Sequence, residues 1–277
     1  MNQVVLINGK EQTKISIFSR NMQYGDGLFE TCVAKDNQIL FWPRHLSRLN
    51  IGCEKLSIKK IDEAVWLNDI KKGFALSSKK GCVVKLILSR GNSLRGYGYK
   101  DDIKPVRVVI ISEMQQSLHN KTFALKYSKS GYHSNPKLAG IKHCNRLEQI
   151  LARSDLSSDE AIMLDEKENV VSVTQGNIYL IFGNKLLTPK LDRCGVVGSR
   201  RSLILELARS LKMDAIEADI SIDQIQQANE VFISNSVIGI QPVTSIEDHK
   251  LGQNPLTEKI QKAFLTKAQE SSSWTCP

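Results

Sequence analysis

Aromatic residues are scarce in this chain: Phe, Trp and Tyr make up 6% of its 277 residues. Surfaces that bind nucleic acids usually gather Lys and Arg into stripes, often with aromatic side chains between them. Here the basic residues are spread along the chain in short pairs such as Lys59-Lys60 and Lys71-Lys72. The composition therefore disfavours nucleic acid as a partner.

Acidic residues are also outnumbered, 29 against 38 basic ones, which leaves a formal net charge of +9. A protein with such a charge attracts anions. Since the pattern of a nucleic-acid-binding surface is missing, small anionic metabolites are the expected ligands.

Long apolar runs and paired cysteine motifs are missing as well. No stretch approaches the roughly 18 apolar residues of a membrane span, and the start MNQVVLINGK lacks the pattern of a secretory signal. The six cysteines show no CxxC spacing, so neither a metal site nor a disulfide framework is predicted. We therefore expect a cytoplasmic protein without a membrane or metal partner.

The first half of the chain mixes strand and helix patterns. A β-hairpin is predicted about Asp36-Asn37, and Pro43 opens a helical pattern. Two runs rich in β-branched residues, 82–89 and 106–112, are typical of buried strands.

In the second half, short apolar strands alternate with amphipathic helices. Apolar side chains share one helical face in residues 146–154, and Asn145 followed by Glu148 resembles a capping box for this helix. The last seven residues, SSSWTCP, have the composition of a loose tail.

A polar, weakly patterned stretch near residue 116 separates the two halves. We therefore predict an α+β domain over residues 1–115, a linker over 116–121 and a second α+β domain over 122–277. A crevice between them is the expected place for a ligand.

Two segments of the second half have the features of anion sites. In GVVGSRR, residues 195–201, Gly198 and Ser199 open a helix, where unpaired N–H groups bind phosphate. In ISNS, small polar residues ending at Ser236 follow a strand. Each segment alone is better explained by an ordinary turn.

Two glycine-rich segments of the first half could shape a ligand site. In SRGNSLRGYGY, Arg90, Arg95 and Tyr97 lie in a loop after a strand, and the planar fork of arginine suits carboxylates. A solvated basic turn is the alternative. In YGDG, Asp26 precedes a strand, and either a tight turn or a functional carboxylate fits.

Lys142 lies between Ile141 and His143 in LAGIKHCNRLEQILAR. A lysine that reacts as a nucleophile needs apolar surroundings or a neighbouring cation, because both favour the neutral amine. These neighbours permit such chemistry, although a solvated lysine would fit the local sequence too.

Taken together and in order, these segments resemble the fold-type IV pyridoxal-phosphate enzymes. This family includes branched-chain aminotransferases, D-amino acid aminotransferases and 4-amino-4-deoxychorismate lyase. LAGIKHCNRLEQILAR and SRGNSLRGY resemble the lysine segment and the SRG-x-GG-RGY loop of the lyase. The resemblance implies two α+β domains, the second a pseudo-barrel, with pyridoxal 5'-phosphate at the domain interface, and a homodimer.

The resemblance also assigns roles to residues. Lys142 would form a Schiff base with the cofactor and act as acid and base. The cofactor phosphate would be bound by Arg48 (in HLSRLN), Ser199, Arg200 and Ser236. The substrate carboxylates would be bound by Arg95, and with less support from the motif by Arg90 and Tyr97.

The implied activity is that of the lyase, which converts 4-amino-4-deoxychorismate to 4-aminobenzoate and pyruvate through an external aldimine, a step toward folate. One alternative is a D-amino acid or branched-chain aminotransferase. Another is a non-catalytic paralogue that binds the cofactor or anionic ligands. Ser93-Leu94, where the lyase loop usually has two glycines, keeps the last reading open.

One position departs from the family pattern. The family usually has a glutamate, paired with the pyridine nitrogen, five residues before the asparagine that here is Asn177. This chain has Ser172 there, and a shifted alignment offers only Gln175. A neutral hydroxyl stabilises a pyridinium less than a carboxylate does. We therefore predict that Ser172 disfavours transamination and leaves the lyase reaction possible.

Overall fold

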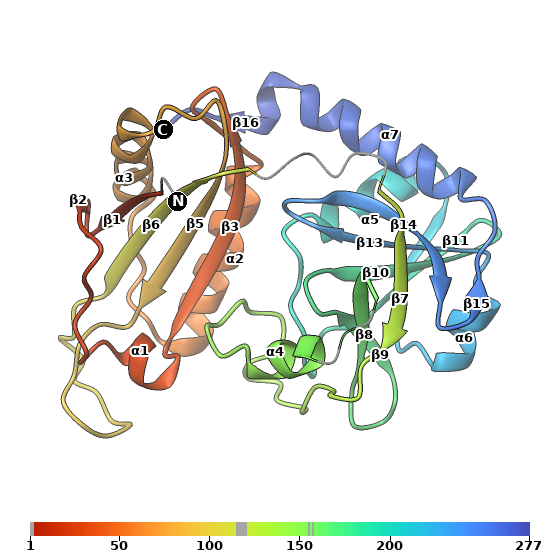
Figure 1. Ribbon diagram of the computed structural model, residues 1–277, viewed down its shortest axis with the longest axis horizontal. Coiled ribbons are helices and arrows are strands. Elements are labelled where there is room, and N and C mark those ends of the chain that lie inside the picture. Colours follow the sequence, from red (N-terminus) through yellow and green to blue (C-terminus); the bar gives the residue numbers. More distant parts are fainter. Residues whose placement is uncertain (1–2, 115–120, 155, 157) are drawn as a thin grey trace. The chain divides into compact units, whose positions relative to one another are not determined.

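The computed structural model describes residues 3–114, 121–154, 156 and 158–277. These residues divide into two compact units, each of which is visible in Figure 1. Unit 1 contains the described residues up to 114 together with 141–145 and 270–277, and unit 2 contains the remainder. The two later segments of unit 1 are the difference from the predicted domain bounds. Residues 116–120 of the predicted linker lie outside the described residues.

Unit 1 is built on one antiparallel sheet, in which the described residues form seven strands in the order β16-β4-β3-β5-β6-β1-β2. Their bounds are Trp274–Thr275 (β16), Gln38–Leu40 (β4), Gly27–Lys35 (β3), Gly81–Ser89 (β5), Val106–Glu113 (β6), Val4–Ile7 (β1) and Lys10–Glu11 (β2). The predicted hairpin is confirmed, because β3 and β4 pair around Asp36 and Asn37. Both residues have positive φ angles, 49° and 60°, as a type I′ turn requires.

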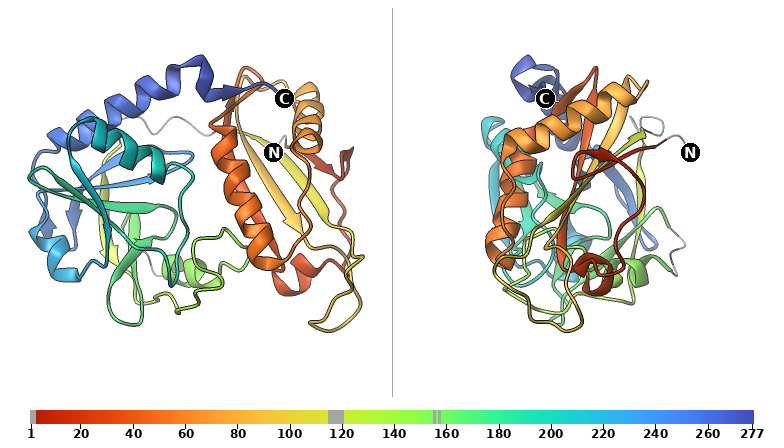
Figure 2. Two further views of the ribbon diagram at one scale, coloured as in Figure 1. Left: turned by 180° about the vertical axis from the view of Figure 1, so that it is seen from behind. Right: turned by 90° about the vertical axis from the view of Figure 1, so that its left-hand side faces the viewer.

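Two helices, α2 (Trp42–Leu56) and α3 (Glu63–Leu76), cover one face of this sheet (Figure 2). Glycines allow their close approach. A Cβ atom on Gly52 of α2 would lie 2.7 Å from the side chain of Leu28, and one on Gly73 of α3 would lie 2.6 Å from Ile111. The contact between Gly52 and Leu28 fixes α2, and with it Arg48, against β3. A short helix, α1 (Arg20–Tyr24), precedes β3.

The end of the chain is ordered in unit 1, so the prediction of a loose tail is wrong. After a short 3₁₀ helix, Ser271–Ser273, Trp274 pairs with Leu40 at the edge of the sheet. The Phe41 N–H also donates to the Ser273 carbonyl oxygen at 2.7 Å. A partner strand distant in sequence orders a segment whose own composition favours no structure.

Unit 2 contains a second sheet, in which the described residues form nine strands ordered β12-β11-β10-β13-β14-β7-β8-β9, with β15 paired to β14. Their bounds are Asp214–Ala218 (β12), Lys185–Pro189 (β11), Asn177–Phe182 (β10), Glu230–Asn235 (β13), Gly239–Ile246 (β14), Phe123–Tyr127 (β7), Glu160–Leu164 (β8), Val170–Val173 (β9) and His249–Lys250 (β15). Apolar side chains from seven of these strands share one core. They can do so because the sheet curls (Figure 1).

The helices of unit 2 are α4 (Leu147–Ser154), α5 (Arg201–Ser210), α6 (Ile222–Gln227) and α7 (Pro255–Gln269). In α5 one apolar face is buried at Ile204 and Ala208. Strands that are mostly antiparallel, with helices packed beside them, confirm the α+β class. In the described part of the chain, no helix is long and apolar enough to cross a membrane.

Helix α4 forms where predicted, but its apolar face is exposed. Leu147, Ile150 and Leu151 are 70%, 61% and 57% exposed. The helix begins only at Leu147. Two other bonds take the place of the predicted capping box: the Asn145 amide donates to the Gly25 carbonyl, and the Glu148 carboxylate accepts the His133 N–H.

Candidate active site

The predicted site residues form two groups, one in each unit. Unit 1 holds Lys142, Arg48, Arg90, Arg95 and Tyr97. Unit 2 holds Ser172, Ser199, Arg200 and Ser236. Within each unit, contacts to neighbouring strands and turns fix where these residues lie.

Lys142 lies in a segment that pairs with the start of β3. The Phe29 N–H donates to the Lys142 carbonyl oxygen at 3.0 Å, and the Cys144 N–H donates to the Gly27 carbonyl oxygen at 2.9 Å. An antiparallel bridge joins the same two segments. The backbone of Lys142 is therefore held by β3, and its position does not depend on what the ammonium group contacts.

The side chain of Lys142 rests on an aromatic ring. Its Nζ atom lies 4.2 Å from the centre of the Phe29 ring, and Nζ of Lys85 lies 5.4 Å from the same centre. The face of a phenyl ring attracts a cation and excludes water. An apolar wall of this kind favours the neutral amine that a nucleophilic lysine needs.

Arg48 projects from α2 onto a buried carboxylate of β3. Its Nε donates to Glu30 Oε1 and its Nη2 to Glu30 Oε2, each at 2.6 Å. His45 Nδ1 lies 2.7 Å from Glu30 Oε2, and Glu30 is 1% exposed. The paired bonds fix the plane of the guanidinium group.

Glu30 remains ionised in this position. Burial raises the pKa of its carboxyl, but the charge and hydrogen bonds of Arg48 and those of His45 outweigh burial and lower the pKa to about 2. The sequence held a signal for this group. Strand alternation places Glu30 on the same face as Leu28 and Cys32, and a carboxylate among apolar neighbours needs a cation.

In unit 2, the turn before α5 is shaped for close contact. A Cβ atom at Gly198 would lie 2.1 Å from Asn177 Oδ1, so only glycine fits there without a shift. The Asn177 amide also donates to the Val196 carbonyl oxygen at 2.9 Å. The Gly140 N–H donates to Gly195 O, and the Val197 N–H donates to Gly140 O, both at 3.0 Å. These bonds hold the turn against a residue that lies two positions before Lys142 in the chain.

Ser199 follows this turn and is 7% exposed. Among the described residues, its hydroxyl has no hydrogen-bond partner although it is buried. A buried hydroxyl without a partner is unfavourable unless a ligand supplies one. Together with the glycine turn and the helix start, it fits the phosphate of the cofactor that the family resemblance implies.

Arg200 and Ser236 lie together. Arg200 is 2% exposed, and its Nη2 approaches the Ser236 carbonyl oxygen at 3.5 Å. Asn235 shapes the turn at Ser236, because its Oδ1 accepts the N–H groups of Val237 and Ile238, each at 2.8 Å. The structure thus brings two of the four predicted phosphate residues into direct proximity.

Ser172 is buried on β9, with Tyr132 as its neighbour. The Tyr132 hydroxyl lies 3.0 Å from Ser172 Oγ, which donates to the Val173 carbonyl oxygen at 2.9 Å. Burial raises the pKa of Tyr132 although its bonds to Ser172 and Gln149 oppose the shift. Two neutral hydroxyl groups therefore lie side by side at Ser172, the position where the family resemblance led us to expect a carboxylate.

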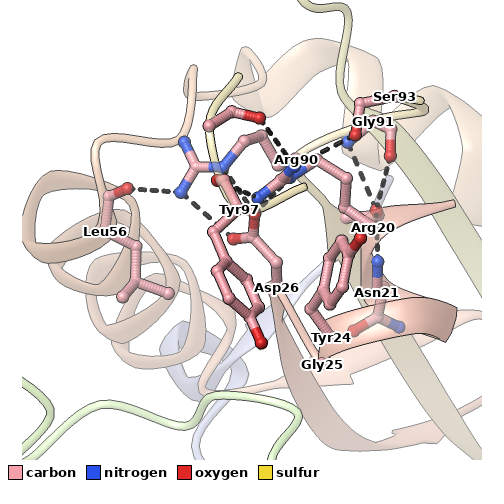
Figure 3. Close-up of polar contacts among 12 residues, drawn as sticks. Arg20, Asn21, Tyr24, Gly25, Asp26, Leu56, Arg90, Gly91, Ser93 and Tyr97 are labelled. Carbon is pink, nitrogen blue, oxygen red and sulfur yellow. Dashed lines mark hydrogen bonds and ion pairs between the residues drawn. The ribbon is translucent and has the colours of Figure 1, made fainter. Parts of the chain in front are cut away.

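The three predicted substrate residues differ in burial: Arg90 is buried, whereas Arg95 and Tyr97 are exposed, and Figure 3 shows Arg90 and Tyr97. Arg90 is 5% exposed, and its guanidinium donates to Asp26 and to the carbonyl oxygens of Leu56 and Ser57. Tyr97 is 85% exposed. The substrate contact of Arg90 stays a prediction, but the structure gives its nitrogen atoms acceptors within the protein.

Sequence reasoning missed Arg20, the other arginine on Asp26. Its Nε donates to Asp26 Oδ2 at 2.7 Å, and it is 3% exposed. Arg20 lies outside the motifs that suggested function. The available signal was the short spacing of six residues between Arg20 and Asp26, at the two ends of α1, which is common in any basic chain.

Comparison with known proteins gives a consistent result. The profile of the amino-transferase class IV family matches residues 27–246. The aminodeoxychorismate lyase of Vibrio harveyi is 30% identical over 270 residues, which cover 92% of this chain and 97% of that protein.

Solved structures agree with the fold. The crystal structure of 4-amino-4-deoxychorismate lyase from Pseudomonas aeruginosa superposes with a TM-score of 0.89 at 33% identity, covering 95% of this chain and 98% of that one. The branched-chain aminotransferase of the archaeon Thermoproteus uzoniensis, solved with norvaline, gives 0.88 at 19% identity, with coverage of 98% of each chain. The fold-type IV prediction is confirmed, and the second match supports the fold alone.

The Glu30 pair predicts a specific dependence of stability on pH. The pKa of Glu30 falls from an ordinary 4.5 to about 2 on folding, so its contribution is present above pH 4.5 and is lost as the pH falls toward 2. Glu30→Gln should lower the free energy of unfolding at pH 7 by about 3 kcal/mol. The free energy of unfolding of the Glu30→Gln variant should also decline less steeply than that of the wild type between pH 4.5 and pH 2. Chemical denaturation at a series of pH values measures both.

Glu54→Gln is the matched control. Glu54 pairs with Lys60 at the surface, where both side chains are well exposed, and its loss should change stability by less than about 1 kcal/mol. If Glu30→Gln and the wild type lose stability with the same slope below pH 4.5, folding does not lower the pKa of Glu30.

Proposed function

Because the chain belongs to the amino-transferase class IV family, we propose that it is a pyridoxal 5'-phosphate-dependent 4-amino-4-deoxychorismate lyase. This proposal rests mainly on the similarity of the chain to two such lyases, at 30% and 33% identity over more than nine-tenths of its length. The aminotransferase described above is 19% identical. The lysine segment and the RGY loop favour the same choice.

The residues present suit the cofactor. Lys142 would hold its aldehyde carbon, and the phosphate would lie against the start of α5, with Arg48, Ser199, Arg200 and Ser236 as its ligands. The strongest structural support for a phosphate here is the buried hydroxyl of Ser199, which has no hydrogen-bond partner among the described residues. When bound, the cofactor supplies an electron sink for the carbon that carries the substrate amine.

The protein's own part in the reaction is to bind, orient and move protons. Freed from the cofactor by the substrate amine, Lys142 would remove the proton from ring carbon C4 of the substrate. The bond between C3 and the ether oxygen would then break, and the enolpyruvyl group would leave with the proton from Lys142 as pyruvate. The ring would become aromatic as 4-aminobenzoate. Arg95, with Tyr97, would bind the substrate carboxylates, since a guanidinium group can donate two parallel hydrogen bonds to one carboxylate.

Lys142→Ala should abolish both cofactor attachment and turnover. The absorbance of the bound cofactor should disappear, and 4-aminobenzoate formation should fall by about 10⁴-fold or more, because the same amine is acid and base. Lys137→Ala, an exposed lysine in the same segment, is the control and should retain both signals.

Other results would select an alternative. A wild-type protein that stays colourless with added pyridoxal phosphate would favour the non-catalytic reading. A coloured protein that forms no 4-aminobenzoate but exchanges amino groups between D-amino or branched-chain amino acids and oxo acids would favour an aminotransferase.

Ser172 bears on this choice. With Tyr132 it offers hydroxyl groups where a carboxylate would stabilise a positive charge on the cofactor ring. A ring without that charge is a weaker electron sink. Elimination that ends in an aromatic product needs less help from the sink than transamination does, so the pair favours the lyase.

Ser172→Glu should raise transamination with amino donors by about tenfold, a decrease of about 1.4 kcal/mol in the barrier. The absorption spectrum of the bound cofactor should shift at the same time, because the ring nitrogen gains a proton. In Ser172→Gln the new side chain has the size of glutamate but no charge. This variant should change neither the rate of transamination nor the absorption spectrum. Equal donor reactions in the Glu and Gln variants would show that charge at this position does not select the reaction.

The exposed face of α4 supports a homodimer. Three large apolar side chains, Leu147, Ile150 and Leu151, are more than half exposed on one helix, and symmetric pairing of identical chains is the commonest way to cover such a surface. We therefore place α4 in a contact between two copies of this chain.

The double variant Leu147→Glu, Leu151→Glu should shift the protein from dimer to monomer in sedimentation velocity. Two charges per chain in an apolar contact should weaken association by about 100-fold or more. Ser154→Glu adds a charge to the exposed end of the same helix and should leave the dimer intact. A wild type that sediments as a monomer at micromolar concentration would exclude the contact.

The setting of the reaction is part of the proposal. The six cysteines are free, as is usual in a reducing compartment, which supports a cytoplasmic location. The product 4-aminobenzoate places the reaction on the route to folate.

A further inference from the structure

A single carboxylate joins the two buried arginines near the RGY loop (Figure 3). Asp26 Oδ2 accepts from Arg20 Nε and from Arg90 Nε, each at 2.7 Å, and Oδ1 accepts from Arg90 Nη2 at 3.1 Å. Burial raises the pKa of Asp26, but the hydrogen bonds and charges of Arg90 and Arg20 outweigh it and hold the pKa below its ordinary value. The group is therefore a charged clamp at neutral pH.

The remaining donors of Arg20 all reach into the loop. Its Nη1 donates to Ser93 Oγ and to the carbonyl oxygens of Gly96 and Gly98, at 3.0, 3.2 and 3.1 Å. Its Nη2 donates to the Tyr97 carbonyl oxygen at 2.8 Å. One guanidinium thus gathers three consecutive carbonyl groups, which directly follow Arg95.

Apolar packing contributes little to the shape of this loop. Leu94 and Tyr97 are 79% and 85% exposed. Two rings of the loop nevertheless make contacts. The Tyr99 ring centre lies 3.8 Å from the guanidinium carbon of Arg90 and 5.4 Å from that of Arg20. The Tyr97 ring meets the Tyr24 ring edge-on, with centres 5.5 Å apart. The Gly96 N–H also donates to the Tyr24 hydroxyl at 3.2 Å, but Arg20 alone binds four acceptors of the loop and so contributes most to its conformation.

We infer that Arg20, fixed by Asp26, is a positioning residue that sets the conformation of residues 93–98 and so presents Arg95 to the carboxylates of the substrate. The inference rests on the proposed function for the role of Arg95, but the effect on the loop is independent of it. Lysine could not replace Arg20, because a single ammonium lacks the fork that spans Asp26 and the loop carbonyls. Ser93 supports the arrangement, since its hydroxyl gives Arg20 an acceptor that glycine lacks.

The test compares the cofactor-loaded wild type with Arg20→Lys and Asp26→Asn. The rate of trypsin cleavage after Arg95, followed by mass spectrometry, reports how firmly the loop is held, and steady-state formation of 4-aminobenzoate gives KM and kcat separately.

Arg20→Lys should speed trypsin cleavage after Arg95 about tenfold, because several charge-assisted bonds to the loop are lost. The KM should rise about tenfold, with kcat within about threefold and the cofactor absorbance unchanged, as expected for lost substrate binding. Asp26→Asn should shift both in the same direction.

Arg107→Lys is the matched control. Arg107 also pairs with a buried aspartate of unit 1, since its Nε donates to Asp69 Oδ2 at 2.6 Å. Among the described residues, its side-chain hydrogen bonds go to this aspartate rather than to the loop. Arg107→Lys should leave the rate of cleavage after Arg95 and the KM unchanged.

Unaltered cleavage in Arg20→Lys, or a loss of kcat at constant KM in that variant, would overturn the inference. A wild type without lyase activity would refute the proposed function, and cleavage alone would then decide the role of Arg20.

Discussion

Pairing between arginines and two carboxylates, buried Glu30 and partly buried Asp26, is the interaction on which the candidate site of unit 1 depends. Asp26 and Glu30 lie four residues apart, the first just before β3 and the second within it, and between them they bind Arg20, Arg90 and Arg48. Each carboxylate stays ionised because the arginine charges outweigh its burial. Arg48 is therefore oriented before any anionic ligand arrives, which reduces the ordering that binding requires, and Arg20 and Arg90 are fixed by contacts within the protein.

Locally encoded features were predictable from the sequence. The hairpin about Asp36-Asn37 follows from two residues that tolerate positive φ, and α2 follows from the pattern opened by Pro43. Lys142 stood out only through a motif that extends over many residues. For the hairpin and α2, the signal and the structure lie within one short segment.

Features that depend on distant partners could not be predicted. The role of Arg20 requires knowing that residues 93–98 return to it, and nothing near Arg20 states this. A helical pattern shows which side chains of α4 share a face, but not whether another element covers that face. The tail looked unstructured because its partner, β4, lies far away in sequence.

The sheet of unit 1 has a consequence for how the chain is made. Its strand β4 pairs with β16, so the neighbour that completes this side of the sheet leaves the ribosome after all the strands of unit 2. Until then, β4 presents unpaired backbone groups of the kind that other chains can pair with. The order of synthesis thus differs from the order of strands, and unit 1 can finish folding only after translation of both sheets.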